Sequence, residues 1–292
     1  MCGIIGIVSN KPVSINIINS LKKLEYRGYD SAGLATLSNN LIDEKKCSGR
    51  VEELEKILIK NPSNGNIGIG HVRWATHGIP NIINAHPHSS EKVSVVHNGI
   101  IENSDELKKD LEEKGFKFKS QTDTEVITVL VTQFLENSKP LESVFKTLKK
   151  LKGSFALGII FKNFPDIIIG ARRGSPLAVG YSNDENYLGS DSYALKSMTN
   201  KISYLDDGEL CMLSKNNVDF YDLNQKKINK KIYTVSDDEN TTDKGDYKNF
   251  MSKEIFEQSN TIKKCLSEYT DSLKKDINIY NFPIEPKKIN KI

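Results

Sequence analysis

A cysteine at position 2 is the residue of this chain best placed for nucleophilic chemistry. It opens Met1-Cys2-Gly3-Ile4-Ile5-Gly6-Ile7-Val8, an apolar run of strand character. Removal of an initiator methionine is expected when the next side chain is small, and Cys2 then carries both a thiol and an α-amine. Because the pKa of a free α-amine is about 8, this amine can accept the thiol proton near neutral pH. Cys2 is therefore a candidate self-activated nucleophile; the alternative is an ordinary small residue entering a buried strand.

A second group of reactive side chains follows a predicted strand at residues 67–73. Arg73, Trp74, Thr76 and His77 supply a fixed cation, the only tryptophan of the chain, a hydroxyl and an imidazole. Loops at strand ends often carry binding groups, and an arginine fork binds a carboxylate through two parallel hydrogen bonds. The pattern predicts a loop that binds a carboxylate. Each residue alone also fits a structural role: a surface ion pair, a core anchor or a satisfied polar contact.

The segment from His97 to Asn103 contains the pair Asn98-Gly99 between apolar residues. Asn-Gly is the strongest short signal for a hairpin turn, which is one interpretation of it. An Asn amide and a Gly N–H can also both donate to an oxyanion and stabilise a tetrahedral intermediate. The two interpretations are compatible.

Two other segments place charge where a polar substrate can use it. Arg27-Gly28-Tyr29-Asp30-Ser31-Ala32-Gly33 follows the first predicted helix. The capping-box pattern of Thr122 and Glu125 predicts a helix, and Asp123 lies in its first turn. Its carboxylate can receive an ammonium group or can simply face the positive end of the helix. His86-Pro87-His88 has no carboxylate or thiol at ligand spacing, so no metal site is predicted.

These residues must be positioned by short apolar strands that alternate with amphipathic helices through about residue 223. Helices are predicted around residues 17–24, from Asn103 to Gly115 and after Thr122. Strands outnumber helices, and residues 154–161 are apolar on both faces, which favours two packed sheets covered outside by helices. The predicted strands are 67–73, 93–98, 155–161, 167–172, 186–189, 209–214 and 218–223.

The composition changes at Asn224. Residues 224–249 are polar and nearly without apolar side chains, so they are predicted to form a linker after a domain at 1–223. A helical pattern returns from Phe250 to Ile262 and is followed by a lysine-rich tail. Residues 250–292 contain too few apolar residues to fold alone.

Charge and cysteine content exclude several function classes. The 292 residues include 41 basic and 38 acidic side chains, giving a net charge of +3, so no nucleic-acid partner is expected. The four cysteines have no Cys-x-x-Cys pair, which fits a reducing cytoplasm. No run approaches the roughly 18 apolar residues of a membrane helix, and no signal peptide is expected. No glycine-rich phosphate loop occurs, and no cofactor is expected.

Together these motifs resemble the glutaminase half of the glucosamine-6-phosphate synthase family, within the class II glutamine amidotransferases. The resemblance spans residues 2 to about 223 and implies an α+β fold, the four-layer αββα sandwich of N-terminal-nucleophile hydrolases. The segments that carry it are Met1-Cys2-Gly3-Ile4, Arg27 to Gly33, His71 to Gly78, Asn84 to His88, His97 to Asn103 and Thr122 to Glu125.

The resemblance implies a role for each matching residue. Cys2 would attack the carboxamide of glutamine, its α-amine would move the proton, and water would release glutamate from a thioester. Asn98 and Gly99 correspond to the oxyanion hole. Arg73 corresponds to the clamp on the substrate α-carboxylate, and Asp123 to the acceptor of its α-amine.

Further correspondences fall on the loop and on the surroundings of the nucleophile. Trp74, Thr76 and His77 match the loop that closes over glutamine, with Trp74 matching the residue that gates ammonia transfer. Arg27 matches a residue that supports the nucleophile.

Members of the same family continue into a sugar isomerase half. Residues 250–292 correspond only to the start of the segment that leads into that half. Glutamine hydrolysis is therefore the predicted function, and amination of fructose 6-phosphate follows only through an isomerase domain absent from this chain. The alternatives are a non-hydrolytic glutamine-binding subunit and an amidase of the same fold that acts on another amide. A homodimer is left open.

Overall fold

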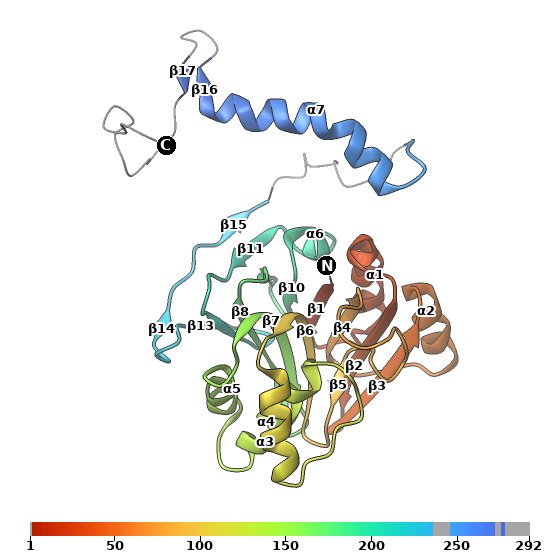
Figure 1. Ribbon diagram of the computed structural model, residues 1–292, viewed down its shortest axis with the longest axis vertical. Coiled ribbons are helices and arrows are strands. Elements are labelled where there is room, and N and C mark those ends of the chain that lie inside the picture. Colours follow the sequence, from red (N-terminus) through yellow and green to blue (C-terminus); the bar gives the residue numbers. More distant parts are fainter. Residues whose placement is uncertain (1, 236–245, 272–275, 278–292) are drawn as a thin grey trace. The chain divides into compact units, whose positions relative to one another are not determined.

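The computed structural model describes residues 2–235, 246–271 and 276–277. The chain divides into two compact units, residues 1–236 and 237–292. In its described residues the first unit contains two large antiparallel sheets with helices on their outer faces (Figure 1). The second unit is described separately below.

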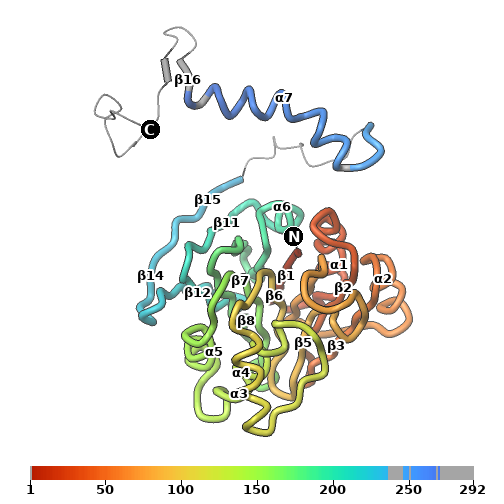
Figure 2. The backbone as a smooth tube through the Cα atoms, in the orientation of Figure 1, coloured from red at the N-terminus to blue at the C-terminus, as the bar shows by residue number. Residues whose placement is uncertain are grey.

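The first sheet contains the strand that follows Cys2. Its eight strands lie in the order β15-β11-β9-β10-β1-β4-β2-β3. β1 pairs with β4 along its whole length, and Figure 2 shows β1 inside the unit. The strand bounds are β1 (Gly3–Val8), β2 (Ser31–Ser38), β3 (Leu41–Ser48), β4 (Ile67–Arg73), β9 (Ala178–Tyr181), β10 (Asn186–Gly189), β11 (Lys201–Tyr204) and β15 (Tyr233–Thr234).

The second sheet contains the strand that carries Asn98 and Gly99. Its seven strands lie in the order β14-β13-β12-β8-β7-β6-β5. They are β5 (His88–Ser89), β6 (Val93–Ile101), β7 (Gly153–Phe161), β8 (Phe164–Arg173), β12 (Leu210–Leu213), β13 (Val218–Tyr221) and β14 (Lys227–Ile228).

Three apolar clusters define four layers. One cluster packs α1 (Ser14–Leu24), α2 (Val51–Lys60) and α6 (Ser192–Leu195) on the first sheet, with the short 3-10 helix η1 (Glu25–Arg27) following α1. A second packs α3 (Ser104–Glu113), α4 (Thr124–Leu135) and α5 (Pro140–Leu148) on the second sheet. The third fills the space between the sheets. This order confirms the predicted αββα sandwich.

Strand alternation decides which side chains of β4 face the site. Ile69 belongs to the cluster between the sheets, whereas Val72 belongs to the cluster under the helices. With a period of two, His71 and Arg73 therefore share the inner face with Ile69. Gly70 faces α1, and a Cβ there would lie 2.5 Å from Ile17 Cγ2, so this glycine allows the helix to approach closely.

The predicted strands are all present. Seven further strands among the described residues of this unit were missed: β2, β3, β5, β9, β11, β14 and β15. In β3 (Leu41–Ser48) the charged side chains pair with one another, as Lys46 does with Glu44 at 3.0 Å, so this strand at the edge of the sheet lacks an apolar alternation. The hairpin interpretation of Asn98-Gly99 is wrong, because both residues lie inside β6. Gly99 still needs to be glycine, since its φ is +133°.

The helix predicted after Thr122 is α4, but its capping box does not form. Thr122 Oγ1 lies 2.9 Å from His88 Nε2 instead of binding the helix. The Glu125 carboxylate accepts hydrogen bonds from the backbone N–H groups of Lys119 and Ser120. The two side chains therefore fix the segment before the helix.

The compact unit extends beyond the predicted boundary at residue 223 to residue 236. Residues 224–236 contribute β14 and β15 to the edges of the two sheets. Lys230 anchors this segment, because its Nζ lies 2.8 Å from Glu209 and 2.6 Å from Asp206. The lysine and Glu209 side chains are largely buried, a pairing that the polar composition of the segment did not indicate.

The second unit contains α7 (Phe250–Tyr269), which confirms the helix predicted from Phe250, and the short strands β16 (Thr270–Asp271) and β17 (Asp276–Ile277). Most of the predicted lysine-rich tail lies outside the described residues. Among the described helices none is long and apolar enough to cross a membrane.

We expect Lys230→Met to lower the free energy of unfolding by about 2 kcal/mol, because it leaves the buried Glu209 carboxylate without its partner. Lys227→Met is the matched control, since Lys227 pairs with Asp219 at 2.6 Å but is 61% exposed. That change should cost much less, because solvent screens the exposed pair. Urea denaturation of both variants measures the difference, and equal losses would contradict the anchoring role.

Candidate active site

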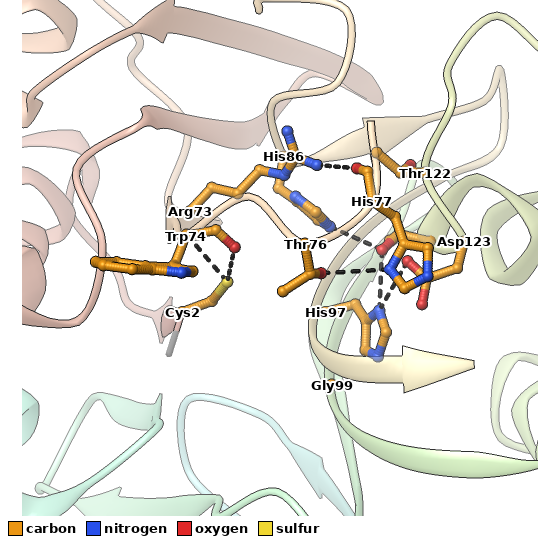
Figure 3. Close-up of a pocket in the computed structure, with 11 residues that line it drawn as sticks. Cys2, Arg73, Trp74, Thr76, His77, His86, His97, Gly99, Thr122 and Asp123 are labelled. Atoms are coloured by element: carbon orange, nitrogen blue, oxygen red, sulfur yellow. Dashed lines mark hydrogen bonds and ion pairs between the residues drawn. The ribbon is translucent and has the colours of Figure 1, made fainter. Parts of the chain in front are cut away.

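Cys2 lies at the amino end of β1, next to the carboxyl end of β4. The Trp74 N–H donates to Cys2 Sγ at 3.2 Å, and the thiol lies 3.5 Å from the Trp74 carbonyl oxygen (Figure 3). Register places Gly3 opposite Val72, so the thiol is held against the backbone that follows the strand. Burial raises the pKa of the Cys2 thiol. A nucleophilic role would therefore require a group that takes the thiol proton.

A small cavity next to Cys2 collects most of the predicted site residues. Its volume is about 20 Å³, which is room for about one water molecule. It is lined by Cys2, Arg73, Trp74, Thr76, His77, His86, His97, Gly99, Thr122, Asp123 and Thr124.

Arg73 holds the loop that follows β4. Its residue surface is 3% exposed, and its Nη2 donates to the carbonyl oxygens of His77 and Gly78. Nη1 lies 3.5 Å from the carbonyl oxygen of Ile79. Carbonyl oxygens thus surround a buried cation, and a carboxylate that reached it would be a stronger acceptor.

Asp123 lies on the other side of the cavity, at the start of α4. Its Oδ2 accepts the Ile101 N–H at 2.8 Å, and its Oδ1 lies 4.0 Å from His97 Nδ1. The hydrogen bond to the end of β6 fixes the carboxylate. A buried cation and a buried carboxylate therefore line one cavity beside the thiol.

Asn98 and Gly99 meet the backbone of Cys2 from the second sheet. Asn98 Nδ2 lies 3.0 Å from the Cys2 carbonyl oxygen and 3.0 Å from Ser190 Oγ. A Cβ at Gly99 would overlap the carbonyl oxygen of Ser154 on β7. The strand can therefore follow this path only with glycine.

A larger cavity of about 390 Å³ opens on another side of Cys2. Arg27 lines it, with Nη2 2.6 Å from Asp191 Oδ2. Trp74 and Thr76 line both cavities, and the Trp74 ring meets Tyr29 edge to face at 6.0 Å. Arg27 is thus brought close to the nucleophile, but outside the small cavity.

Two residues of the segment 27–33 hold the backbone against which Cys2 rests. Ala75 N–H donates to Asp30 Oδ2 at 2.8 Å. A Cβ at Gly28 would lie 2.6 Å from Arg73 C and 2.7 Å from Trp74 N. The segment was singled out by its glycines and charges, but its contact with the end of β4 was not predicted.

Four histidines near the cavity are buried: His86 and His97, which line it, and His71 and His88. The His71 and His86 rings stack at 4.2 Å, and His86 meets His88 edge to face at 4.9 Å. Burial lowers the pKa of His71 to about 3 and lowers those of His86 and His88 well below their usual value. Within the described residues no cluster of side chains is arranged to hold a metal ion.

Comparison with known proteins indicates the class of protein to which this chain is similar. Residues 81–197 match the family model described as a glutamine amidotransferase domain. Among solved structures, the glutamine phosphoribosylpyrophosphate amidotransferase of B. subtilis superposes with a TM-score of 0.67 at 24% identity, over 77% of this chain and 50% of that one. A class-II glutamine aminotransferase domain protein of Silicibacter pomeroyi gives 0.54 at 12% identity, over 76% and 99% of the two chains. Residues 81–197 thus match a glutamine amidotransferase domain, and the chain shares the fold of these two structures.

Curated relatives indicate which amidotransferases this chain resembles. Glutamine–fructose-6-phosphate aminotransferase (isomerizing) of Zymomonas mobilis is 46% identical over 92% of this chain and 44% of its own length. The enzymes of Brucella abortus and Mesorhizobium japonicum are 48% and 45% identical, over 93% and 100% of this chain and 45% and 48% of their own lengths. The chain spans about half the length of these relatives. It is homologous to the glutaminase half of glucosamine-6-phosphate synthase.

We expect stability to fall as the pH drops from about 6.5 toward 3. The folded chain keeps His71, His86 and His88 neutral because burial lowers their pKa, whereas the unfolded chain protonates them below about pH 6.5. Unfolding then takes up protons, so this stabilisation is complete above that pH and is lost below it. Urea titrations at pH 7.5, 6.5 and 5.5 should give an uptake of about three protons at the lowest pH.

His88→Gln is the control for this pH dependence and should reduce the uptake by about one proton. A total uptake below about one proton would contradict the neutral buried cluster.

Proposed function

We propose that this domain hydrolyses L-glutamine to glutamate and ammonia through a thioester on Cys2. In this proposal the ammonia serves the synthesis of glucosamine 6-phosphate from fructose 6-phosphate. The observation that carries the proposal is the convergence of the Cys2 thiol, the Arg73 cation and the Asp123 carboxylate on one cavity. The match to a glutamine amidotransferase domain and the relatives' names support the choice of glutamine.

Acylation begins with attack of Cys2 Sγ on the side-chain carbonyl carbon of glutamine. Burial raises the pKa of the Cys2 thiol, so the thiol needs a base to ionise. Removal of Met1 supplies an α-amine that takes the thiol proton. The carbonyl oxygen becomes an oxyanion, and the amine's proton passes to the leaving nitrogen as the C–N bond breaks. Ammonia leaves, and a glutamyl thioester remains.

Asn98 and Gly99 would stabilise the oxyanion. The position of Asn98 Nδ2, 3.0 Å from the Cys2 carbonyl oxygen, supports this role. Its second N–H is engaged by Ser190 Oγ at 3.0 Å, so donation to the oxyanion requires that one of these bonds be shared or exchanged. Water then attacks the thioester, glutamate departs, and the thiol regains its proton.

Arg73 and Asp123 would recognise the amino-acid end of the substrate. The α-carboxylate replaces the loop carbonyl oxygens around Arg73, and the α-ammonium pairs with Asp123. Because the cavity of about 20 Å³ is smaller than the substrate, the loop with Trp74, Thr76 and His77 must move to admit glutamine. Trp74, which lines both cavities, is suited to gating the passage of ammonia, and Arg27 with Asp191 supports the wall of the larger one.

The acceptor reaction would use residues outside the two cavities beside Cys2. In this proposal fructose 6-phosphate, which the names of the relatives include, would bind to a sugar isomerase domain. The cytoplasmic location and the absence of a cofactor stay predictions, and a homodimer stays open.

The proposed function is tested by glutamate and ammonia release from untagged protein, with and without fructose 6-phosphate. Mass spectrometry confirms beforehand that Met1 is absent. Turnover in the absence of sugar phosphate would mean that the domain works alone. Glutamine binding without turnover would favour the glutamine-binding subunit, and turnover of other amides but not of glutamine would favour a different amidase.

Cys2→Ala should abolish glutamine hydrolysis, because no other described thiol lines the cavity. Cys47→Ala is the matched control, since Cys47 is a buried thiol packed under α2, and this variant should retain activity. A peptide extension before Cys2 should also abolish activity by removing the free α-amine. Full hydrolysis by Cys2→Ala, or by the extended protein, would contradict the mechanism.

Arg73→Lys should raise KM for glutamine about 10-fold or more, because a lysine cannot make the two parallel hydrogen bonds of the guanidinium group. Asp123→Asn should raise KM for glutamine and leave the weak hydrolysis of a substrate without the α-amine almost unchanged. Steady-state kinetics with glutamine and its deaminated analogue separate the two effects. An equal loss on both substrates would contradict the ammonium-binding role of Asp123.

A further inference from the structure

His71 makes a contact between the two sheets directly beneath the nucleophile. It lies on β4, opposite Ile4 of β1, and its side chain faces the space between the sheets. Its Nε2 is 3.0 Å from Asn98 Oδ1 and 3.0 Å from the carbonyl oxygen of His97, both on β6. His71 thus joins the strand beside Cys2 to the strand that carries the candidate oxyanion donors.

The carbonyl oxygen of His97 determines which nitrogen of His71 carries the proton. A backbone carbonyl can only accept, so Nε2 must be the protonated nitrogen of the ring. Burial lowers the pKa of His71 to about 3, so the ring stays neutral and has a single N–H. The residue is 1% exposed and stacked on His86 at 4.2 Å, which holds the ring in place.

The fixed N–H in turn determines how the Asn98 amide is oriented. A donor at His71 Nε2 requires the oxygen of the amide to face it, and Oδ1 does so. The amide nitrogen then points to the Cys2 carbonyl oxygen and to Ser190 Oγ, each 3.0 Å away. In the reversed amide, Nδ2 would face the N–H of His71, which is also a donor. Oδ1 would face the carbonyl oxygen of Cys2, which is also an acceptor.

We propose that His71 is the positioning residue of the oxyanion hole: its Nε2–H locks the Asn98 amide with Nδ2 turned toward the backbone of Cys2. This inference rests on the proposed function and assigns a residue that acts through Asn98 without touching the substrate. Its contribution is made in the transition state, where charge develops on the oxygen of glutamine. It should therefore affect kcat more than KM.

The first test uses the native protein. Nitrogen-15 NMR of the histidine rings, with His71 assigned by comparison with His71→Gln, reports the tautomer at pH 7. The proposal expects a neutral ring protonated at Nε2. A ring protonated at Nδ1, or a charged ring, would overturn it.

The second test uses a double-mutant cycle on glutamine hydrolysis. His71→Leu should lower kcat at least about 10-fold with KM changed by about threefold or less, because ground-state binding through Arg73 and Asp123 is untouched. In the Asn98→Ala background the same change should cost about twofold or less, since its target is absent. His71→Gln, which places an amide N–H where Nε2 lies, should recover most of the loss.

His88→Gln is the matched control, because His88 belongs to the same buried cluster but bonds to Thr122, not to Asn98. It should keep kcat within about twofold of the unaltered protein. Alkylation of Cys2 by iodoacetamide, which forms no oxyanion, should be equally fast in His71→Leu and in the unaltered protein.

Equal losses from His71→Leu in both backgrounds, or slowed alkylation, would overturn the positioning role. An unaltered protein without hydrolysis would instead count against the proposed function, and the NMR result would still decide the inference about the amide.

Discussion

The pairing of β1 with β4 is the constraint on which the site depends. Its register sets Gly3 opposite Val72, which brings the Cys2 thiol to the Trp74 N–H at 3.2 Å. Because side chains alternate along a strand, the same register turns His71 and Arg73 toward the space between the sheets. A shift of one residue would turn all of them into the layer of α1 and its apolar cluster. Strand pairing, more than loop structure, therefore determines where the side chains of the site lie.

Around that pairing, the second sheet supplies the polar partners. β6 carries Asn98 to the Cys2 carbonyl oxygen, and its end receives the Asp123 carboxylate through the Ile101 N–H. Burial then sets the charge states: it keeps the histidines neutral and raises the pKa of the thiol, while Arg73 lies among carbonyl oxygens. Hydrogen bonds within and beside β6 thus fix one side of the site, and the bonds from Arg73 to carbonyl oxygens hold the loop on the other.

Much of this arrangement could be predicted from the sequence, and the failures have physical reasons. β4 and β10 were predicted with their bounds, because their apolar side chains and flanking turns are local signals. β3 was missed because its charged side chains pair with one another at the edge of the sheet.

Asn98-Gly99 has the residue types of a hairpin, but pairing with β7 keeps it in an extended strand. The segment 224–235 joins the first unit through the short edge strands β14 and β15 and through the largely buried pair of Lys230 with Glu209, which no local pattern reveals. The seven motif residues around the small cavity were found because their types carry chemistry, whereas His71 and Asp30 act through contacts distant in sequence and received no role.

The central claim is that Cys2 carries the acyl group of glutamine. Acid quenching of the protein during turnover, followed by proteolysis and mass spectrometry, tests it most directly. The account predicts a glutamyl group on the peptide that begins with Cys2, lost on brief treatment with neutral hydroxylamine, and absent when glutamate replaces glutamine. Turnover with no acyl group on that peptide, or with the group on another residue, would contradict it.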